Sequence, residues 1–126
     1  MRLNQVTVPT LDVERSIEFY RTLGLRLIVK TTRYARFELP DGESTFSIEL
    51  VDNVEGAARG PHVYFECENL DAQVATLKVK GVVFDNDPVD QSWLWREAWL
   101  TDPAGVKLCL FRAGENRRYP PWRISP

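Results

Sequence analysis

The sequence predicts an α+β fold in which two βαβββ modules form a curved, mixed-sheet cup. Three observations predict it: an internal repeat, a matching apolar helix stripe in each copy, and turn residues that divide the rest into extended stretches. With an offset of 57 positions, residues 4–24 align with residues 61–81. The aligned positions share physical character rather than identity, which is typical of a duplicated structural unit.

Each copy begins with an alternating stretch, residues 3–8 and 62–67, that is typical of a strand. Asp12 and Asn69 follow at positions where a short side chain caps a helix N-terminus. Apolar residues then recur at helical spacing on one face. These are Val13, Ile17 and Tyr20 in the first copy, and Leu70, Val74 and Leu77 in the second. A glycine suited to a helix end closes each pattern, at Gly24 and Gly81.

Three extended stretches follow each predicted helix, and Asp, Gly and Pro residues separate them. In the first copy they are residues 25–31, 34–39 and 44–51. In the second they are residues 82–84, 92–100 and 106–111. The alternative is an ordinary α+β domain whose two halves resemble each other by chance.

Length and composition favour one packed domain. The chain has 126 residues, of which 44% are hydrophobic and 27% charged. We expect a single domain over residues 1–112, with modules at about 1–56 and 57–112, and a tail over 113–126. A net charge of −2 and short apolar runs argue against nucleic-acid and membrane partners. Two cysteines without a spaced framework, and no secretory signal, favour a cytoplasmic protein.

Strand parity places a polar and aromatic set on the sheet faces that point away from the helices. The set is Gln5, Arg36, Glu49, His62, Tyr64, Glu66, Trp93, Trp95, Glu97 and Trp99. Three tryptophans on one face indicate a pocket or a partner surface. Carboxylates gathered in a concavity would favour a bound cation, a paired arginine or a raised carboxylate pKa.

At this point the sequence resembles a known family. The segments QVTVPTLDVERSIEFYRTLGL, FSIEL and TDPAGVKLCL are similar to those of the glyoxalase/bleomycin-resistance/extradiol-dioxygenase superfamily, also called vicinal oxygen chelate proteins. The resemblance implies metal ligands on the first and fourth strands of each half. At those positions stand Gln5, Glu49, His62 and Cys109. Such donors could bind Zn²⁺, Ni²⁺, Mn²⁺ or Fe²⁺.

Cys109 departs from the family pattern, because it stands where the family has a glutamate. A thiolate could complete a zinc site, but a thiol cannot replace a glutamate as proton shuttle. Cysteine is also a common small core residue, so packing is the open alternative.

Two functions follow from these features. The first is a glyoxalase-like, metal-dependent lyase, isomerase or dioxygenase acting on a substrate with adjacent oxygens, with Glu49, Glu66 or Glu97 moving the proton. The second is metal-free binding of a small molecule, of the bleomycin-resistance type. In either case we expect Tyr64 and the tryptophans Trp93, Trp95 and Trp99 to stack on the ligand and Arg36 to hold an anionic group.

Other readings stay open for the tryptophans and the assembly. The tryptophans could instead bury against the tail or a second subunit. The resemblance also implies a homodimer, in which the modules pair within one chain or swap between chains.

Overall fold

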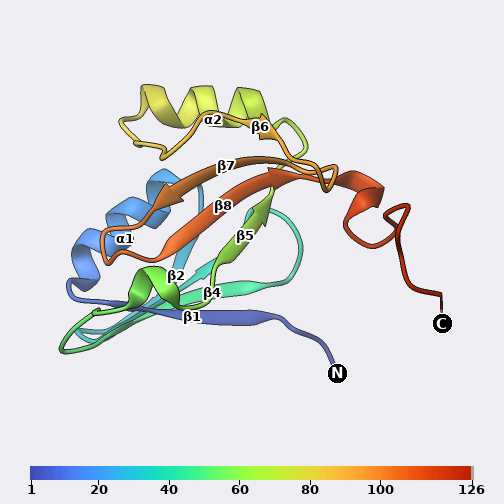
Figure 1. Cartoon of the computed structure of the whole chain (residues 1–126). Coiled ribbons are helices and arrows are strands. Elements are labelled where there is room, and N and C mark those ends of the chain that lie inside the picture. The colour runs from blue at the N-terminus through green and yellow to red at the C-terminus, as the bar shows by residue number, and fades with distance from the viewer. Residues whose placement is uncertain (126) are drawn as a thin grey trace. The chain divides into compact units, whose positions relative to one another are not determined.

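The computed structural model describes residues 1–125, which form two compact units. The first comprises Met1–Pro61 with Thr101–Lys107, and the second comprises His62–Leu100 with the chain from Leu108 onward. Each unit carries a four-stranded sheet and one ten-residue helix (Figure 1). Apart from the 3-10 helices, the order of helices and strands is βαβββ in both halves, so the predicted fold class is confirmed.

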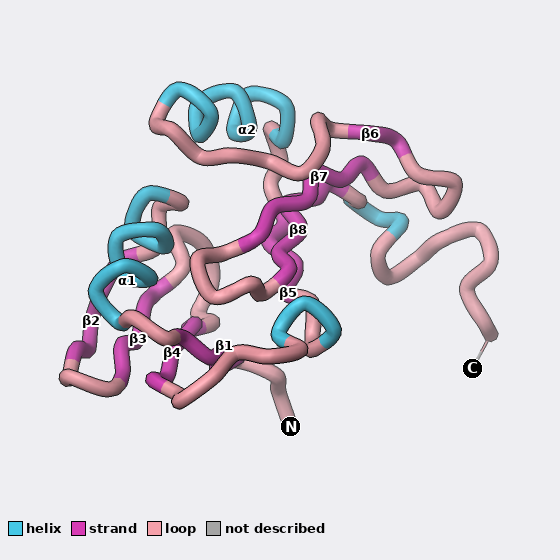
Figure 2. The backbone as a smooth tube through the Cα atoms, turned by 60° about the vertical axis from the view of Figure 1, so that its left-hand side comes forward, coloured by secondary structure: helices cyan, strands magenta, loops and turns pink. Residues whose placement is uncertain are grey.

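The sheet of the first unit has the strand order β1-β4-β3-β2 (Figure 2). Its elements are β1 (Gln5–Thr10), α1 (Val13–Thr22), β2 (Arg26–Lys30), β3 (Tyr34–Glu38) and β4 (Thr45–Leu50). Strands β1 and β4 pair in parallel, whereas the other neighbours are antiparallel. A short 3-10 helix, Ala57–Arg59, follows β4 along the chain.

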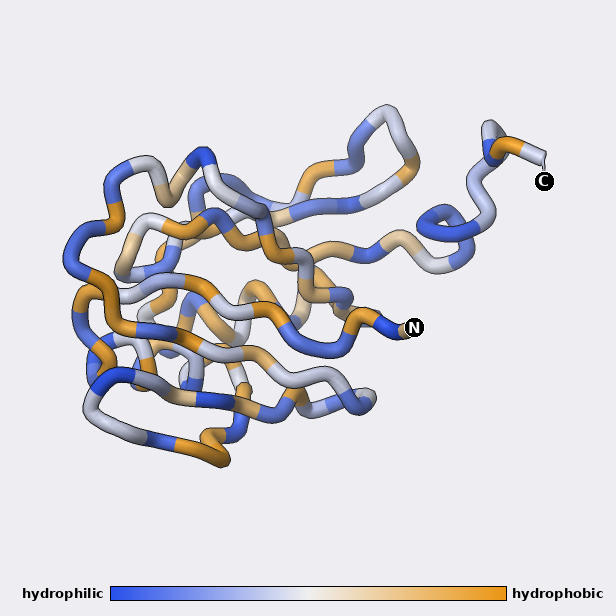
Figure 3. The backbone as a smooth tube through the Cα atoms, turned by 90° about the horizontal axis from the view of Figure 1, so that it is seen from below, coloured by the Kyte–Doolittle hydropathy of each residue, from blue (hydrophilic) through white to orange (hydrophobic). Residues whose placement is uncertain are grey.

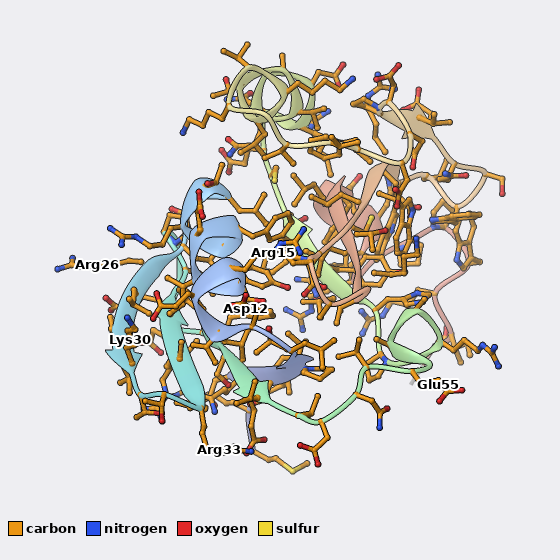
Figure 4. The ribbon with its side chains drawn as sticks, turned by 90° about the vertical axis from the view of Figure 1, so that its left-hand side faces the viewer. Asp12, Arg15, Arg26, Lys30, Arg33 and Glu55 are labelled. Atoms are coloured by element: carbon orange, nitrogen blue, oxygen red, sulfur yellow. The ribbon has the colours of Figure 1, made fainter. Side chains whose placement is uncertain are left out.

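Helix α1 forms where its cap and its apolar stripe predict it. Asp12, at the start of the helix in Figure 4, accepts a hydrogen bond from the backbone N–H of Arg15 at 3.1 Å. The stripe residues Val13, Ile17 and Tyr20 are buried, and the helix contacts β2, β3 and β4. Because one face of α1 is apolar and the other is charged, only the apolar face packs against the sheet.

The turn between β7 (Arg96–Thr101) and β8 (Lys107–Arg112) belongs to the first unit and is organised by Asp102. Its Oδ1 accepts hydrogen bonds from the backbone N–H groups of Ala104 (2.8 Å) and Val106 (2.9 Å). Its Oδ2 accepts a hydrogen bond from the hydroxyl of Tyr20 at 2.5 Å. Burial, together with the charge of Asp102, raises the pKa of Tyr20 far above its ordinary value. The hydroxyl therefore stays a donor and ties the turn to α1.

The sheet of the second unit has the strand order β5-β8-β7-β6. Its elements are β5 (Val63–Glu66), α2 (Leu70–Val79), β6 (Val89–Asp90), β7 (Arg96–Thr101) and β8 (Lys107–Arg112), followed by a 3-10 helix at Gly114–Asn116. Strand parity is visible at β7, where Arg96 bonds to Asp71 of α2 while its neighbour Glu97 lies on the opposite side, with the tryptophans.

Two expected strand ranges differ from the structure. Residues 82–84 form no strand, and only Phe84 makes an isolated bridge, to Leu100. The backbone N–H of Val82 donates to the carbonyl of Leu77 at the end of α2 (3.0 Å), so it cannot donate to a neighbouring strand, and the edge strand β6 forms later, after the turn-forming segment 85–88. Residues 92–95 form a turn rather than the first half of β7. A smaller difference is that the Asn69 side chain makes no capping hydrogen bond.

The turn before β7 contains a strained residue. Leu94 has φ +69°, a left-handed conformation that a Cβ disfavours. Its N–H donates to the carbonyl of Gln91 at 3.0 Å, and the Gln91 N–H donates to the carbonyl of Trp95 at 2.7 Å. Hairpin loops of this kind normally place glycine at the left-handed position.

Replacement of Leu94 by glycine is therefore expected to stabilise the protein. The Leu94 side chain is 47% exposed, so little packing is lost with it. We expect a gain of about 0.5–1 kcal/mol in the free energy of unfolding, because relief of strain exceeds the added entropy of the unfolded chain. Urea denaturation of L94G and of L94A measures this. A glycine variant less stable than the alanine variant would contradict the strain.

The hydropathy pattern agrees with this architecture. Figure 3 shows hydrophobic and hydrophilic residues following one another in short stretches, while the tail beyond β8 is mostly hydrophilic. Among residues 1–125, neither helix has the length and apolar character needed to cross a bilayer.

Candidate functional site

The second unit contains an open pocket of about 620 Å³. Strand β5, the turn before β7, and β7 itself supply its lining residues. These are His62, Tyr64, Gln91, Trp93, Trp95, Glu97 and Trp99. A concave, mostly aromatic surface with few polar groups is typical of a small-molecule site.

The aromatic rings of the pocket brace one another. Tyr64 makes edge contacts with Trp95 and Trp99, with ring centroids 5.9 and 5.5 Å apart. Trp95 stacks on Phe111 of β8 at 4.6 Å, and its indole N–H donates to the carbonyl of Asn116 at 3.3 Å. The start of the tail thus holds Trp95 in place. Tyr64 and Trp93 stay 44% and 45% exposed, so their surface remains open to a ligand.

Glu97 forms the polar base of the pocket and is only 2% exposed. Its Oε2 accepts a hydrogen bond from the indole N–H of Trp93 at 2.9 Å, and its Oε1 accepts one from Trp99 at 3.0 Å. Indole N–H groups only donate, so both carboxylate oxygens act as acceptors. The carboxylate therefore fixes the orientation of both tryptophans.

Cys109 lies under this aromatic layer. It pairs with Tyr64 across the parallel strands β5 and β8 and is fully buried, with Trp95 and Trp99 packed against its cluster. Burial, with a smaller contribution from the charge of Glu97, raises the pKa of the thiol to about 12. Because Trp95 and Trp99 pack over this fully buried thiol, it fits a metal ligand poorly. Its surroundings favour the packing interpretation.

The raised pKa of Cys109 predicts a pH effect on stability. A thiol whose pKa rises on folding, here from 9.0 to about 12, stabilises the fold below pH 9 and loses that contribution as the pH climbs toward 12. The free energy of unfolding of C67A and of C67A/C109A should be measured from about pH 7 to about pH 11. We expect the difference between the two proteins to shrink as the pH rises. A difference that stays constant would contradict the raised pKa.

Of the other predicted metal ligands, His62 lines this pocket, whereas Gln5 and Glu49 do not. Gln5 and Glu49 belong to the first unit, whereas His62 and Cys109 belong to the second. Gln5 is in register with Thr45, and Glu49 with Pro9, so the two share a sheet face but stand four positions apart, about 13 Å along the strands. Gln5 Oε1 accepts a hydrogen bond from Thr45 at 2.8 Å. Within the described part of either unit, no three His, Cys, Asp or Glu side chains group to share an ion. The four-residue site remains a prediction.

The remaining candidates also separate. Arg36 lies in the first unit, where its Nε donates to the hydroxyl of Tyr34 at 2.9 Å. Glu66 lies 3.8 Å from Arg117 of the tail and is not part of the pocket lining. His62 is at the pocket, with its ring 5.3 Å from that of Trp99 in an edge contact. Gln91 lines the pocket as well, but no pattern in the sequence distinguishes it from an ordinary turn residue.

Comparison with known proteins decides the family. The model of the Glyoxalase/Bleomycin resistance protein/Dioxygenase superfamily matches residues 2–110, which is most of the chain. The chain belongs to this superfamily. Within it, the sequence is 26% identical over 122 residues to a probable trivalent organoarsenical cleaving enzyme of Bacillus subtilis strain 168, covering 92% of this chain and 83% of that protein.

Solved structures of the superfamily share the fold. A bleomycin-binding protein in complex with bleomycin superposes with a TM-score of 0.74 at 18% identity, covering 89% of this chain and 98% of that one. A lactoylglutathione lyase from Agrobacterium tumefaciens gives 0.71 at 13% identity, covering 88% and 92%. These similarities therefore include both a binding protein and an enzyme, and they establish the fold alone.

Proposed function

We propose that this member of the superfamily binds a planar small molecule in the aromatic pocket of its second unit and holds it without chemical change. The observation that carries the proposal is the lining itself. Three tryptophans and a tyrosine surround a carboxylate whose oxygens are both engaged by indole donors. Such a surface supplies stacking area and fixed orientation.

The surroundings of Cys109 support binding over metal-assisted chemistry. In the superfamily pattern this position holds a glutamate ligand, whereas here a buried thiol is covered by Trp95 and Trp99. The position therefore adds to the packed floor of the pocket. The similarity to a bleomycin-binding protein is compatible with such a role.

A neutral planar dye tests the proposal. Nile red should bind with one site per chain and gain fluorescence on entering the apolar pocket. Trp122→Ala, in the exposed tail, is the matched control and should bind as the wild type does. Mass spectrometry after incubation should recover the dye unchanged. Saturation at many sites would reject the proposal, and so would Trp99→Ala binding the dye as tightly as the wild type does.

The second candidate is the glyoxalase-like, metal-dependent enzyme. It is favoured by one observation, the 26% identity over 122 residues to a probable trivalent organoarsenical cleaving enzyme. In such an enzyme, a divalent ion with His62 of the pocket among its ligands would act as a Lewis acid on adjacent substrate oxygens. A cytoplasmic location and a homodimeric assembly remain predictions with either function.

Elemental analysis separates the two candidates. The protein should be purified without an affinity tag and loaded in turn with Zn²⁺, Ni²⁺, Mn²⁺ and Fe²⁺. The binding proposal expects no stoichiometric metal in any sample. A stoichiometric metal that is lost in His62→Ala would instead support the enzyme.

A further inference from the structure

The charge inside the pocket is not balanced. Of the seven lining residues, Glu97 is the one carrying a formal charge at neutral pH, since histidine is counted as neutral. Both of its oxygens accept hydrogen bonds from groups that cannot accept a proton, an arrangement that fits the ionised carboxylate. The pocket thus presents a fixed negative charge behind aromatic walls.

Several basic side chains of the second unit pair with carboxylates other than Glu97. Arg96, the chain neighbour of Glu97, bonds to Asp71 and Asp90. Lys78 pairs with Asp87, and Arg117 lies beside Glu66. Across residues 1–125, none of the ion pairs reaches Glu97. A buried carboxylate without a cationic partner is costly, so a ligand that brings positive charge would be favoured.

The aromatic walls favour the same sign of charge. Trp93, Trp95, Trp99 and Tyr64 line the pocket, and the face of an aromatic ring carries the negative side of its quadrupole. A cation over such a face is attracted most strongly when it sheds its water easily. A metal ion or a primary ammonium is tightly hydrated, whereas an alkylated or aromatic ammonium is not.

Building on the proposed binding function, we infer that the pocket selects planar organic cations, with Glu97 as the counter-charge and the tryptophan rings as the cation-binding walls. Glu97 acts in two ways. Its charge sets the sign of the ligand, and its hydrogen bonds hold Trp93 and Trp99 in position. A neutral aromatic of the same shape keeps the stacking but loses the electrostatic attraction.

Three probes of nearly equal shape test the inference: N-methylquinolinium as cation, quinoline as neutral compound and 2-naphthoate as anion. Calorimetric titration at a pH where quinoline is neutral should rank the cation first, at least about ten-fold tighter than quinoline, with the anion weakest. The preference should persist at high salt, because salt screens a buried charge much less than an exposed one.

Two matched variants assign the preference to Glu97. E97Q removes the buried charge, and the cation should then bind no better than quinoline. E68Q removes an exposed charge of the same unit, changes the net charge equally, and should keep the wild-type ranking. Circular dichroism checks that both variants fold. Should E97Q unfold, the ranking and salt dependence of the wild type decide alone.

The outcomes distinguish the inference from the function on which it rests. If quinoline or 2-naphthoate binds as tightly as the cation, the charge selection is overturned while the aromatic binding site stands. If E68Q abolishes the preference as E97Q does, net charge rather than the pocket is responsible and the inference fails. If none of the three probes binds, the proposed function fails together with the inference.

Discussion

Replacement of Asp102 by alanine is expected to lower the free energy of unfolding by about 3 kcal/mol. Asp102 is 4% exposed and accepts hydrogen bonds from the Tyr20 hydroxyl and from the backbone of Ala104 and Val106. Alanine would leave these three buried donors without an acceptor, at about 1–3 kcal/mol each if water cannot reach them. Urea denaturation should show a midpoint lower by about 1.5 M.

Two further variants show where this stability comes from. Tyr20→Phe removes one donor and keeps both backbone bonds of Asp102, so a loss of about 1–2 kcal/mol is expected. Asp52→Ala changes an exposed carboxylate and should stay within about 0.5 kcal/mol of the wild type. If Asp102→Ala loses no more free energy of unfolding than Asp52→Ala, water must form the hydrogen bonds that the three donors of the turn have lost.

Replacement of Trp99 by alanine is expected to weaken Nile red binding by about 30-fold or more, as removal of a central tryptophan commonly does. Trp99 contacts both Tyr64 and His62, and its indole N–H holds Glu97. Its loss therefore removes one aromatic side of the pocket. It also leaves Glu97 Oε1 without its indole donor, so the carboxylate holds Trp93 less firmly. The dye titration described above provides the measurement.

The same substitution should uncover the thiol of Cys109. In a Cys67→Ala background, Cys109 should react slowly with a disulfide reagent at pH 8 in the wild-type pocket, because it is buried and its pKa is raised to about 12. With Trp99 replaced by alanine, the reaction should accelerate strongly. An unchanged rate would show that another part of the structure protects this thiol.

The fold could be predicted because its signals are local and occur twice. Asp12 caps α1, and the stripe from Val13 to Tyr20 is buried, as the helical spacing predicts. Strand parity also places Glu97 and Trp99 on the same face of β7, where the two side chains form a hydrogen bond. These patterns follow from backbone geometry, which a single sequence carries.

The turn before β7 could not be predicted in the same way. Trp93 and Trp95 alternate with other residues and resemble a strand, yet they stand in a loop. The signal that would reveal the loop is glycine at its left-handed position, and Leu94 occupies that position instead. Trp93 and Trp95 join Trp99 in one pocket because of the conformation of the turn, and not because of strand parity. The part played by Gln91 depends on the same turn.

Two of the four outer strands of the sheets, β2 and β6, also affect how the protein behaves when it is concentrated. Strand β2 carries Arg26 and Lys30 and has an irregular register between Leu27 and Val29, while β6 is only two residues long. Charge, a bulge and shortness each make a sheet border a poor template for an incoming chain. Ordered fibre growth from these two borders is therefore disfavoured, even though their backbone groups remain available to solvent.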